Sequence, residues 1–207
     1  LAANCEILER NDPDKQVGFY VDEWGTWYDQ EEGSTPGFLY QQNSLRDAVV
    51  AAVNFNIFHR YADRVQMTTI AQMVNVLQAM VLTEGDQMLL TPTYHVFRMY
   101  RPFQGATTVP VELTGAGEYR CGDEAIHAVS ATAARAEDGK LYLALVNVDP
   151  DREQYISIVL QGMAANSAQG EVLTANTMDA HNTFDLPRAL TPQPYSATVL
   201  NGDLILE

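Results

Sequence analysis

Residues 17–28, with the sequence VGFYVDEWGTWY, join a short apolar run to a cluster of carboxylates and aromatic rings. Residues 17–21 have the length and the aromatic and branched composition of a β-strand. The run continues directly into Asp22 and Glu23, and burying carboxylates there would be costly unless the strand end opens on water or a cleft. This stretch therefore predicts a buried strand whose carboxyl end carries a candidate site.

Helix and strand patterns alternate on both sides of this stretch, over residues 1–103. Residues 1–10 read as the end of a helix that the turn at 11–13 closes, and Ser44 with Asp47 forms a capping-box pattern at the start of a second helix. A second strand is predicted at 64–69, and Thr91-Pro92 opens a third helix. Strands separated by helices predict βαβ units with a parallel sheet, but two strands alone would leave its faces bare.

The apolar face of the second helix is predicted from its 3.6-residue period. Its members recur at i, i+3, i+4, i+7 and i+8 from the cap onward. They are Leu45, Ala48, Val49, Ala52 and Val53.

The pattern changes near residues 103–106, which we take as a domain boundary. Two strands, at 126–135 and 140–148, are joined by the turn sequence Glu137-Asp138-Gly139, and shorter runs follow at 154–160, 170–174 and 195–200. Asn201-Gly202 turns the chain into a last run at 204–206. Residues 104–207 therefore predict an antiparallel β-sandwich or jelly roll, whereas residues 1–103 predict an α/β domain.

Composition bounds the possible partners. Twelve basic against 27 acidic residues give a net charge of −15, which disfavours nucleic acid and anionic membrane surfaces. Cys5 and Cys121 form no disulfide framework, and their number fits a cytoplasmic as well as a secreted or periplasmic setting. The longest uninterrupted apolar run, at 48–53, is too short to span a bilayer.

Residues 22–28 are the best candidate for chemistry. They place two carboxylates and three large aromatic side chains at the end of a predicted parallel strand, where active sites lie in closed α/β barrels. A carboxylate can attack an anomeric carbon, and aromatic rings stack on sugar faces. The same spacing also fits a structural acid pair with core tryptophans, so these residues alone leave both interpretations open.

The sequence VDEWGTWY at residues 21–28 resembles the nucleophile motif of the family 51 glycoside hydrolases, the α-L-arabinofuranosidases. Residues 62–66 (ADRVQ) and 71–76 (AQMVNV) resemble that family's last barrel strand and the following loop, and residues 36–43 (PGFLYQQN) resemble the loop before a helix in its bacterial members. The resemblance implies that residues 1–103 are the C-terminal part of a (β/α)8 catalytic barrel and that residues 104–207 are the β-sandwich domain.

The resemblance also implies roles for single residues. Glu23 matches the glutamate that attacks the anomeric carbon and forms the glycosyl-enzyme intermediate, with Asp22 orienting the strand end. Trp27 matches an aromatic residue near the sugar-binding cleft, and Gln72 matches an amide that hydrogen-bonds the arabinose. Gly25-Thr26 stands where some members carry Asn and Val, so substrate preference stays open. The hypothesis requires the Glu23 carboxylate at the mouth of a pocket.

The implied activity is the release, with retention, of terminal α-L-arabinofuranosyl residues from arabinan, arabinoxylan or their oligosaccharides. The partner acid/base should be a glutamate after an Asn, and no Asn-Glu pair occurs in the 207 residues. We therefore expect upstream sequence or a second chain to supply it with the remaining barrel strands, and a chain that begins at Leu1 in mid-fold. Relatives are often oligomers, so a homo-oligomer is possible.

Two alternatives stay open. The same machinery could act on xylosides or glucans. The sandwich could instead be a carbohydrate-binding or purely structural module, and the scatter of its aromatic residues favours the structural role.

Other candidate residues carry no recognisable site. His59, His95, His127 and His181 lack metal-ligand spacing, so no zinc site is predicted, and His95 and His127 are expected to be packed or surface residues. No organic cofactor is implied.

Overall fold

The computed structural model describes residues 1–206. Helix α1 (Ala2–Asn11) precedes strand β1 (Phe19–Trp24), which pairs in parallel with β2 (Val65–Ile70). The strand predicted at 17–21 thus begins later and extends through both carboxylates, whereas the strand predicted at 64–69 is confirmed within one residue. The predicted parallel pairing is also confirmed.

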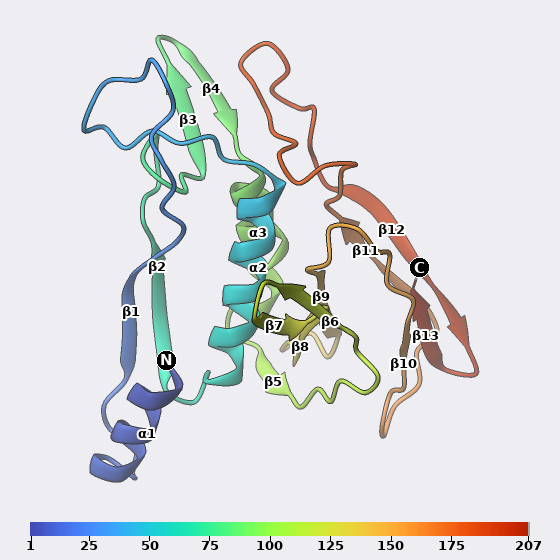
Figure 1. Cartoon of the computed structure of the whole chain (residues 1–207). Helices are drawn as coiled ribbons and strands as arrows, with labels where there is room; N and C mark the ends of the chain where they lie inside the picture. Colours follow the sequence, from blue (N-terminus) through green and yellow to red (C-terminus); the bar gives the residue numbers. More distant parts are fainter. Residues whose placement is uncertain (207) are drawn as a thin grey trace.

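Helix α2 (Leu45–Arg60) forms the centre of the molecule, between the β1–β2 pair and the antiparallel sheets (Figure 1). The capping box is confirmed, since the Asp47 carboxylate accepts the Ser44 backbone N–H at 2.9 Å. The predicted apolar face is confirmed too: Leu45, Ala48 and Ala52 are buried, and Val49 and Val53 pack against the same core. This core fills the space on both sides of the helix.

Helix α3 (Pro92–Met99) begins where the Thr91-Pro92 pair predicts, because the Thr91 side chain accepts the Tyr94 backbone N–H. A 3-10 turn at Arg101–Phe103 follows it. Strands β3 (Val81–Glu84) and β4 (Gln87–Leu90) form a hairpin that the sequence analysis does not predict. Gly85, with φ of +58°, makes its turn, so the signal was a single glycine between two short runs.

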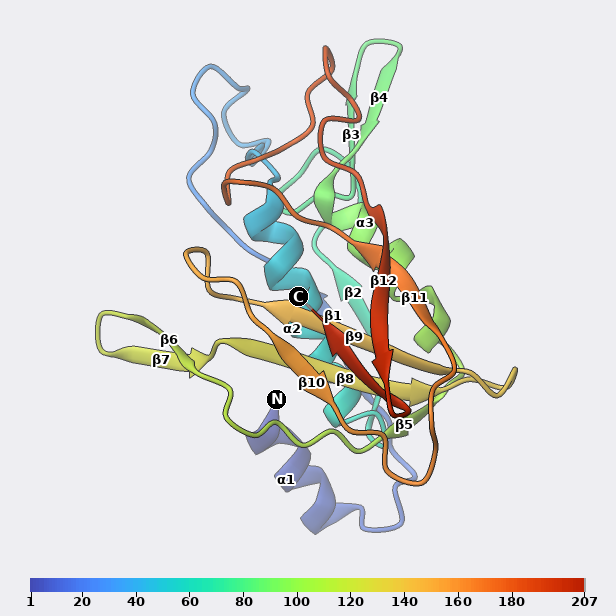
Figure 2. The ribbon, with the colours of Figure 1, turned by 90° about the vertical axis from the view of Figure 1, so that its right-hand side faces the viewer.

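The C-terminal half is antiparallel and rich in strands, as predicted. One sheet has the strand order β5-β8-β9 and another the order β10-β13-β12-β11, with β6 and β7 forming a separate hairpin (Figure 2). The strands are β5 (Thr107–Val109), β6 (Glu118–Cys121), β7 (Glu124–His127), β8 (Val129–Arg135), β9 (Leu141–Asn147), β10 (Ile156–Ile158), β11 (Ala168–Val172), β12 (Gln193–Leu200) and β13 (Asp203–Leu206).

Both predicted turns of this half are confirmed. Residues 136–140 join β8 to β9, and Asn201-Gly202 joins β12 to β13 with positive φ at both residues. Asn-Gly tolerates this backbone better than any pair with a bulky side chain, which is why it predicts the hairpin.

One hydrophobic core joins the two halves. Residues of α2 pack on Val21, Val65 and Ile70 of the β1–β2 pair, and the same cluster includes Val146 and Val148 from β9 and its end. The division at 103/104 therefore stays a prediction. Cys5 is buried and Cys121 exposed, and both are free thiols. No helix within residues 1–206 is long and apolar enough to cross a membrane.

Candidate functional site

The end of β1 is anchored by Trp24. Its ring, 9% exposed, lies 5.4 Å from the Phe55 centroid and 5.5 Å from Phe58, both edge-on, and stacks on Phe97 at 5.9 Å. Such aromatic contacts combine a large buried area with a preferred geometry. The last residue of β1 is thus fixed against α2 and α3.

The two carboxylates precede this anchor at an irregularity of the strand. Val21 pairs with Thr68 and Trp24 with Ile70, so three steps along β1 match two along β2. Such a bulge interrupts the alternation of side chains. Asp22 and Glu23 are both exposed.

The ends of β1 and β2 are brought together next to Gln72. The Ala71 backbone N–H donates to the Trp24 carbonyl at 2.8 Å, and Gln72 follows as an exposed residue. Gly25 has φ of +147°, and a Cβ there would lie 3.3 Å from the Ala71 carbonyl oxygen. Both its backbone conformation and this close approach therefore favour glycine at this position. Glu23 and Gln72 thus lie at the carboxyl ends of two neighbouring strands, Glu23 within β1 and Gln72 just after β2.

The chain leaving Gly25 is held by three buried side chains, which we call the polar clamp: Gln41, Asp47 and Gln78. The Thr26 backbone N–H donates to Gln78 Oε1 at 3.0 Å, and the Thr26 hydroxyl donates to Asp47 Oδ1 at 2.8 Å. Two residues on, the Tyr28 backbone N–H donates to Gln41 Oε1 at 2.9 Å. Residues 26–28 are therefore held by the backbone N–H groups of Thr26 and Tyr28 and by the Thr26 hydroxyl.

The polar clamp is itself tied to the helices behind it. Gln78 Nε2 donates to the Asp47 carbonyl at 2.7 Å and to Thr93 Oγ1 at 3.3 Å. The Thr93 hydroxyl in turn donates to Asn43 Oδ1 at 2.9 Å. Buried polar groups are costly unless paired, so this network admits few alternative arrangements.

Trp27 extends from this fixed segment with 68% of its surface exposed. Within residues 1–206 its ring packs against no other aromatic ring, whereas its neighbour Tyr28 carries the Arg46 guanidinium 3.7 Å above the ring centroid. Glu23 therefore lies one residue before the end of β1, Trp27 three residues beyond that end and Gln72 two residues beyond the end of β2. All three side chains are exposed there.

The exposed residues of this site can be identified from the sequence, whereas the buried ones cannot. Asp47 is predicted only as a helix cap, and Gln41 and Gln78 are not singled out. Spacing does not distinguish a buried glutamine from a solvated one. Gln41 lies in the motif at residues 36–43, and Gln78 lies two residues after the motif at 71–76.

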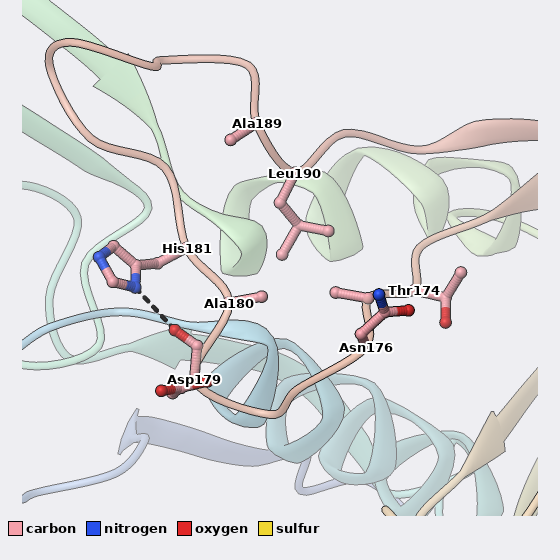
Figure 3. Close-up of a pocket in the computed structure, with 8 residues that line it drawn as sticks. Thr174, Asn176, Asp179, Ala180, His181, Ala189 and Leu190 are labelled. Carbon is pink, nitrogen blue, oxygen red and sulfur yellow. Dashed lines mark hydrogen bonds between the residues drawn. The ribbon is translucent and has the colours of Figure 1, made fainter.

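Two hollows of the structure lie elsewhere. One, of about 490 Å³, lies in the loop between β11 and β12, with Asp179, His181 and Leu190 in its lining (Figure 3). The Ala180 and Met178 carbonyls of this loop accept the Leu45 and Arg46 N–H groups, so the loop serves to cap α2. Another, of about 540 Å³, lies between α1 and Arg64. Neither is lined by Glu23, so the required pocket around Glu23 stays a prediction.

The histidines are placed as expected. His95 is buried on α3, with its pKa lowered mainly by burial, and His127 is exposed on β7. Among residues 1–206 there is no group of three or more His, Cys, Asp or Glu side chains that could hold a metal ion.

The chain combines an α/β part, with exposed carboxylates at the end of one of two parallel strands, and antiparallel sheets that follow it. Residues 22–206 match the family model described as the α-L-arabinofuranosidase C-terminal domain. The chain belongs to this family, and it corresponds to the C-terminal portion of the family 51 glycoside hydrolases, as the motif at residues 21–28 predicts.

Individual relatives agree with this assignment. An intracellular exo-α-L-arabinofuranosidase from Bacteroides ovatus is 44% identical over 201 residues, which cover 97% of this chain and 39% of the relative. The crystal structure of the GH51 arabinofuranosidase from Xanthomonas axonopodis pv. citri has 46% identity and a TM-score of 0.93, covering 98% of this chain and 41% of that one. A Thermotoga maritima arabinofuranosidase shares the fold at 21% identity and a TM-score of 0.78. The chain thus spans about two fifths of the length of these relatives.

Proposed function

We propose that this chain supplies the nucleophile of a retaining exo-α-L-arabinofuranosidase, and that Glu23 is that nucleophile. The observation that carries the proposal is that the exposed residues Glu23, Trp27 and Gln72 lie at or just beyond the carboxyl ends of two paired parallel strands. Such strand ends are where barrel enzymes carry their catalytic residues. The names of the relatives supply the substrate class.

The mechanism assigns one step to each group. The Glu23 carboxylate attacks the anomeric carbon of a terminal arabinofuranosyl unit as the glycosidic bond breaks, giving a covalent glycosyl-enzyme ester. A second carboxyl group, about 5–5.5 Å away, protonates the leaving oxygen and then activates the water that hydrolyses the ester with overall retention. Gln72 would hydrogen-bond the sugar and Trp27 would cover one of its faces.

The second carboxyl group and the rest of the pocket come, in this proposal, from further barrel strands outside this chain. The β1–β2 pair supports this, because one side packs on α2 while Tyr20 and Met67 are 56% and 46% exposed. Exposed apolar side chains on a two-stranded sheet indicate that another part of the protein packs against this face. The C-terminal sheets would form the jelly roll that braces the barrel.

The structural role of residues 104–207 is favoured over carbohydrate binding. A binding face needs a row of exposed aromatic rings. Tyr155 is 75% exposed, but Tyr119, Tyr142 and Phe184 are partly buried. The test is retention of the full-length protein on insoluble arabinoxylan. If the protein is retained and Tyr155→Ser abolishes this retention, a carbohydrate-binding module is favoured instead.

The decisive experiment replaces Glu23 by Gln and by Ala in the full-length protein and measures turnover of an aryl α-L-arabinofuranoside. We expect a loss of at least about 10³-fold, and partial recovery of the Glu23→Ala variant with added azide, which can attack in place of the carboxylate. Asp22→Asn is the matched control, an adjacent exposed carboxylate with a smaller expected loss. Turnover by the Glu23 variants within a few-fold of the parent would refute the assignment.

A panel of aryl glycosides separates the substrate classes. Arabinofuranosides should be hydrolysed fastest, and a preference for xylosides or glucosides would replace the substrate while keeping the nucleophile.

A further inference from the structure

We infer that the polar clamp, Gln41, Asp47 and Gln78, positions Trp27 relative to Glu23 and Gln72. This inference rests on the proposed function, in which those three exposed residues contact the sugar. Gln41 is 2% exposed, and Asp47 and Gln78 are 0% exposed, so none of the three can touch a substrate. Gln78 and Gln41 hold the backbone N–H groups of Thr26 and Tyr28, and Asp47 holds the Thr26 hydroxyl, so all three are positioning residues.

Hydrogen bonds hold the two neighbours of Trp27 in the chain rather than Trp27 itself. Its ring is 68% exposed and lacks an aromatic partner among residues 1–206. Both flanking N–H groups, from Thr26 and Tyr28, donate to buried amide oxygens. Two hydrogen bonds that bracket Trp27 therefore hold the backbone from which its side chain extends.

Any other conformation of residues 26–28 would cost free energy. If residues 26–28 moved, Gln78 Oε1 would lose the Thr26 N–H, and Asp47 Oδ1 would lose the Thr26 hydroxyl. Both acceptors would remain buried without these donors, which is more costly than losing a hydrogen bond at the surface. The polar clamp therefore selects one conformation of the segment.

Gln78 also connects the segment that carries Trp27 to the segment that carries Gln72. Gln78 lies in the loop that begins with Ala71 and Gln72, and Gly25 approaches both the Ala71 carbonyl and Gln78 Oε1. One buried amide thus fixes the spacing between the segment after β1 and the segment after β2. A displacement of Gln78 would move Trp27 and Gln72 relative to each other.

Hydrogen exchange of the full-length protein tests the positioning directly. In Gln78→Met, which keeps the side-chain length but loses its polar atoms, amides in a peptide covering residues 25–30 should exchange about tenfold faster or more. Asn182→Leu is the matched control. Asn182 is another buried amide, bonded to the Leu90 and Leu190 backbone, and its loss should leave exchange at 25–30 unchanged.

Steady-state kinetics on an aryl arabinofuranoside supply the second readout. Thr26→Val removes the hydroxyl that binds Asp47 and should raise KM about tenfold while kcat changes less, because a misplaced stacking ring weakens binding. Thr26→Ser should restore KM. A merely structural role would instead lower the active fraction, reducing apparent kcat at constant KM, as expected for Asn182→Leu.

The outcomes separate the two proposals. Unchanged exchange at 25–30 in folded Gln78→Met, or faster exchange with unchanged KM in Thr26→Val, would overturn the positioning role. If Gln78→Met does not fold, exchange and KM of Thr26→Val and Thr26→Ser decide the question. An active Glu23→Gln enzyme would overturn the proposed function, whereas the exchange result would still report on the polar clamp.

Discussion

Trp24 and Trp27 lie three positions apart at the end of β1, in two regions that are built differently. Below the strand end, Trp24 packs among phenylalanine rings of α2 and α3. Above it, Trp27 is exposed on a segment held by hydrogen bonds to buried amides and a carboxylate. The aromatic region makes the scaffold stable, whereas the polar region holds the backbone that carries an exposed side chain without burying that side chain.

The largest expected effect separates these two tryptophans. Trp24→Ala should destabilise the full-length protein by about 3–5 kcal/mol, because it leaves a cavity in a packed core. Trp27→Ala should change the free energy of unfolding by less than about 0.5 kcal/mol, as for most exposed positions. Urea unfolding followed by far-UV circular dichroism measures both, and equal losses would contradict the comparison.

An intermediate effect is expected for the polar region. Asp47→Asn should cost about 1–3 kcal/mol, because the amide replaces one of two acceptor oxygens that bind the Ser44 N–H and the Thr26 hydroxyl in a buried site. Arg46→Met is the control: its side chain is 41% exposed, so loss of its bond to Asp47 should cost less than about 1 kcal/mol. The same urea titration compares them, and a larger loss for Arg46→Met would contradict this account.

The smallest effect is a pH dependence that belongs to the aromatic region. Burial lowers the pKa of His59, whose ring stacks on Phe103 at 5.0 Å. Between the lowered pKa of the folded state and the ordinary pKa near 6.5, the unfolded chain binds more protons. This contribution to stability is complete above the ordinary pKa and is lost as the pH falls through the folded pKa.

Thermal unfolding of the full-length protein between about pH 7.5 and pH 5.5 tests this sign. The midpoint should fall on acidification, and it should fall less in His59→Phe, which keeps the ring packing. A variant with the same or a steeper dependence on pH would place the titrating groups elsewhere. His95, whose pKa burial also lowers, accounts for part of the remaining slope.

Much of the fold could be predicted because its signals are local. The Ser44–Asp47 cap, the Thr91-Pro92 helix start and the Asn201-Gly202 turn each depend on residues within a few positions of one another. The β3–β4 hairpin escaped prediction because its runs are short and its turn has one glycine. The bulge before Trp24 escaped because an extra residue in a strand leaves no local sequence signal.

The sequence by itself determined the apolar face of α2, the main turns, and the candidate residues Glu23, Trp27 and Gln72, because periodicity, capping and motif are written in neighbouring residues. Only the tertiary structure decided that Gln41, Asp47 and Gln78 are buried together beneath Thr26, although they lie up to 37 positions apart in the chain. Burial depends on which segments pack against one another, and a buried polar side chain is costly unless it is hydrogen-bonded. The spacing of an amide in the sequence does not show whether it is buried. Its structural role is therefore decided only when the chain folds.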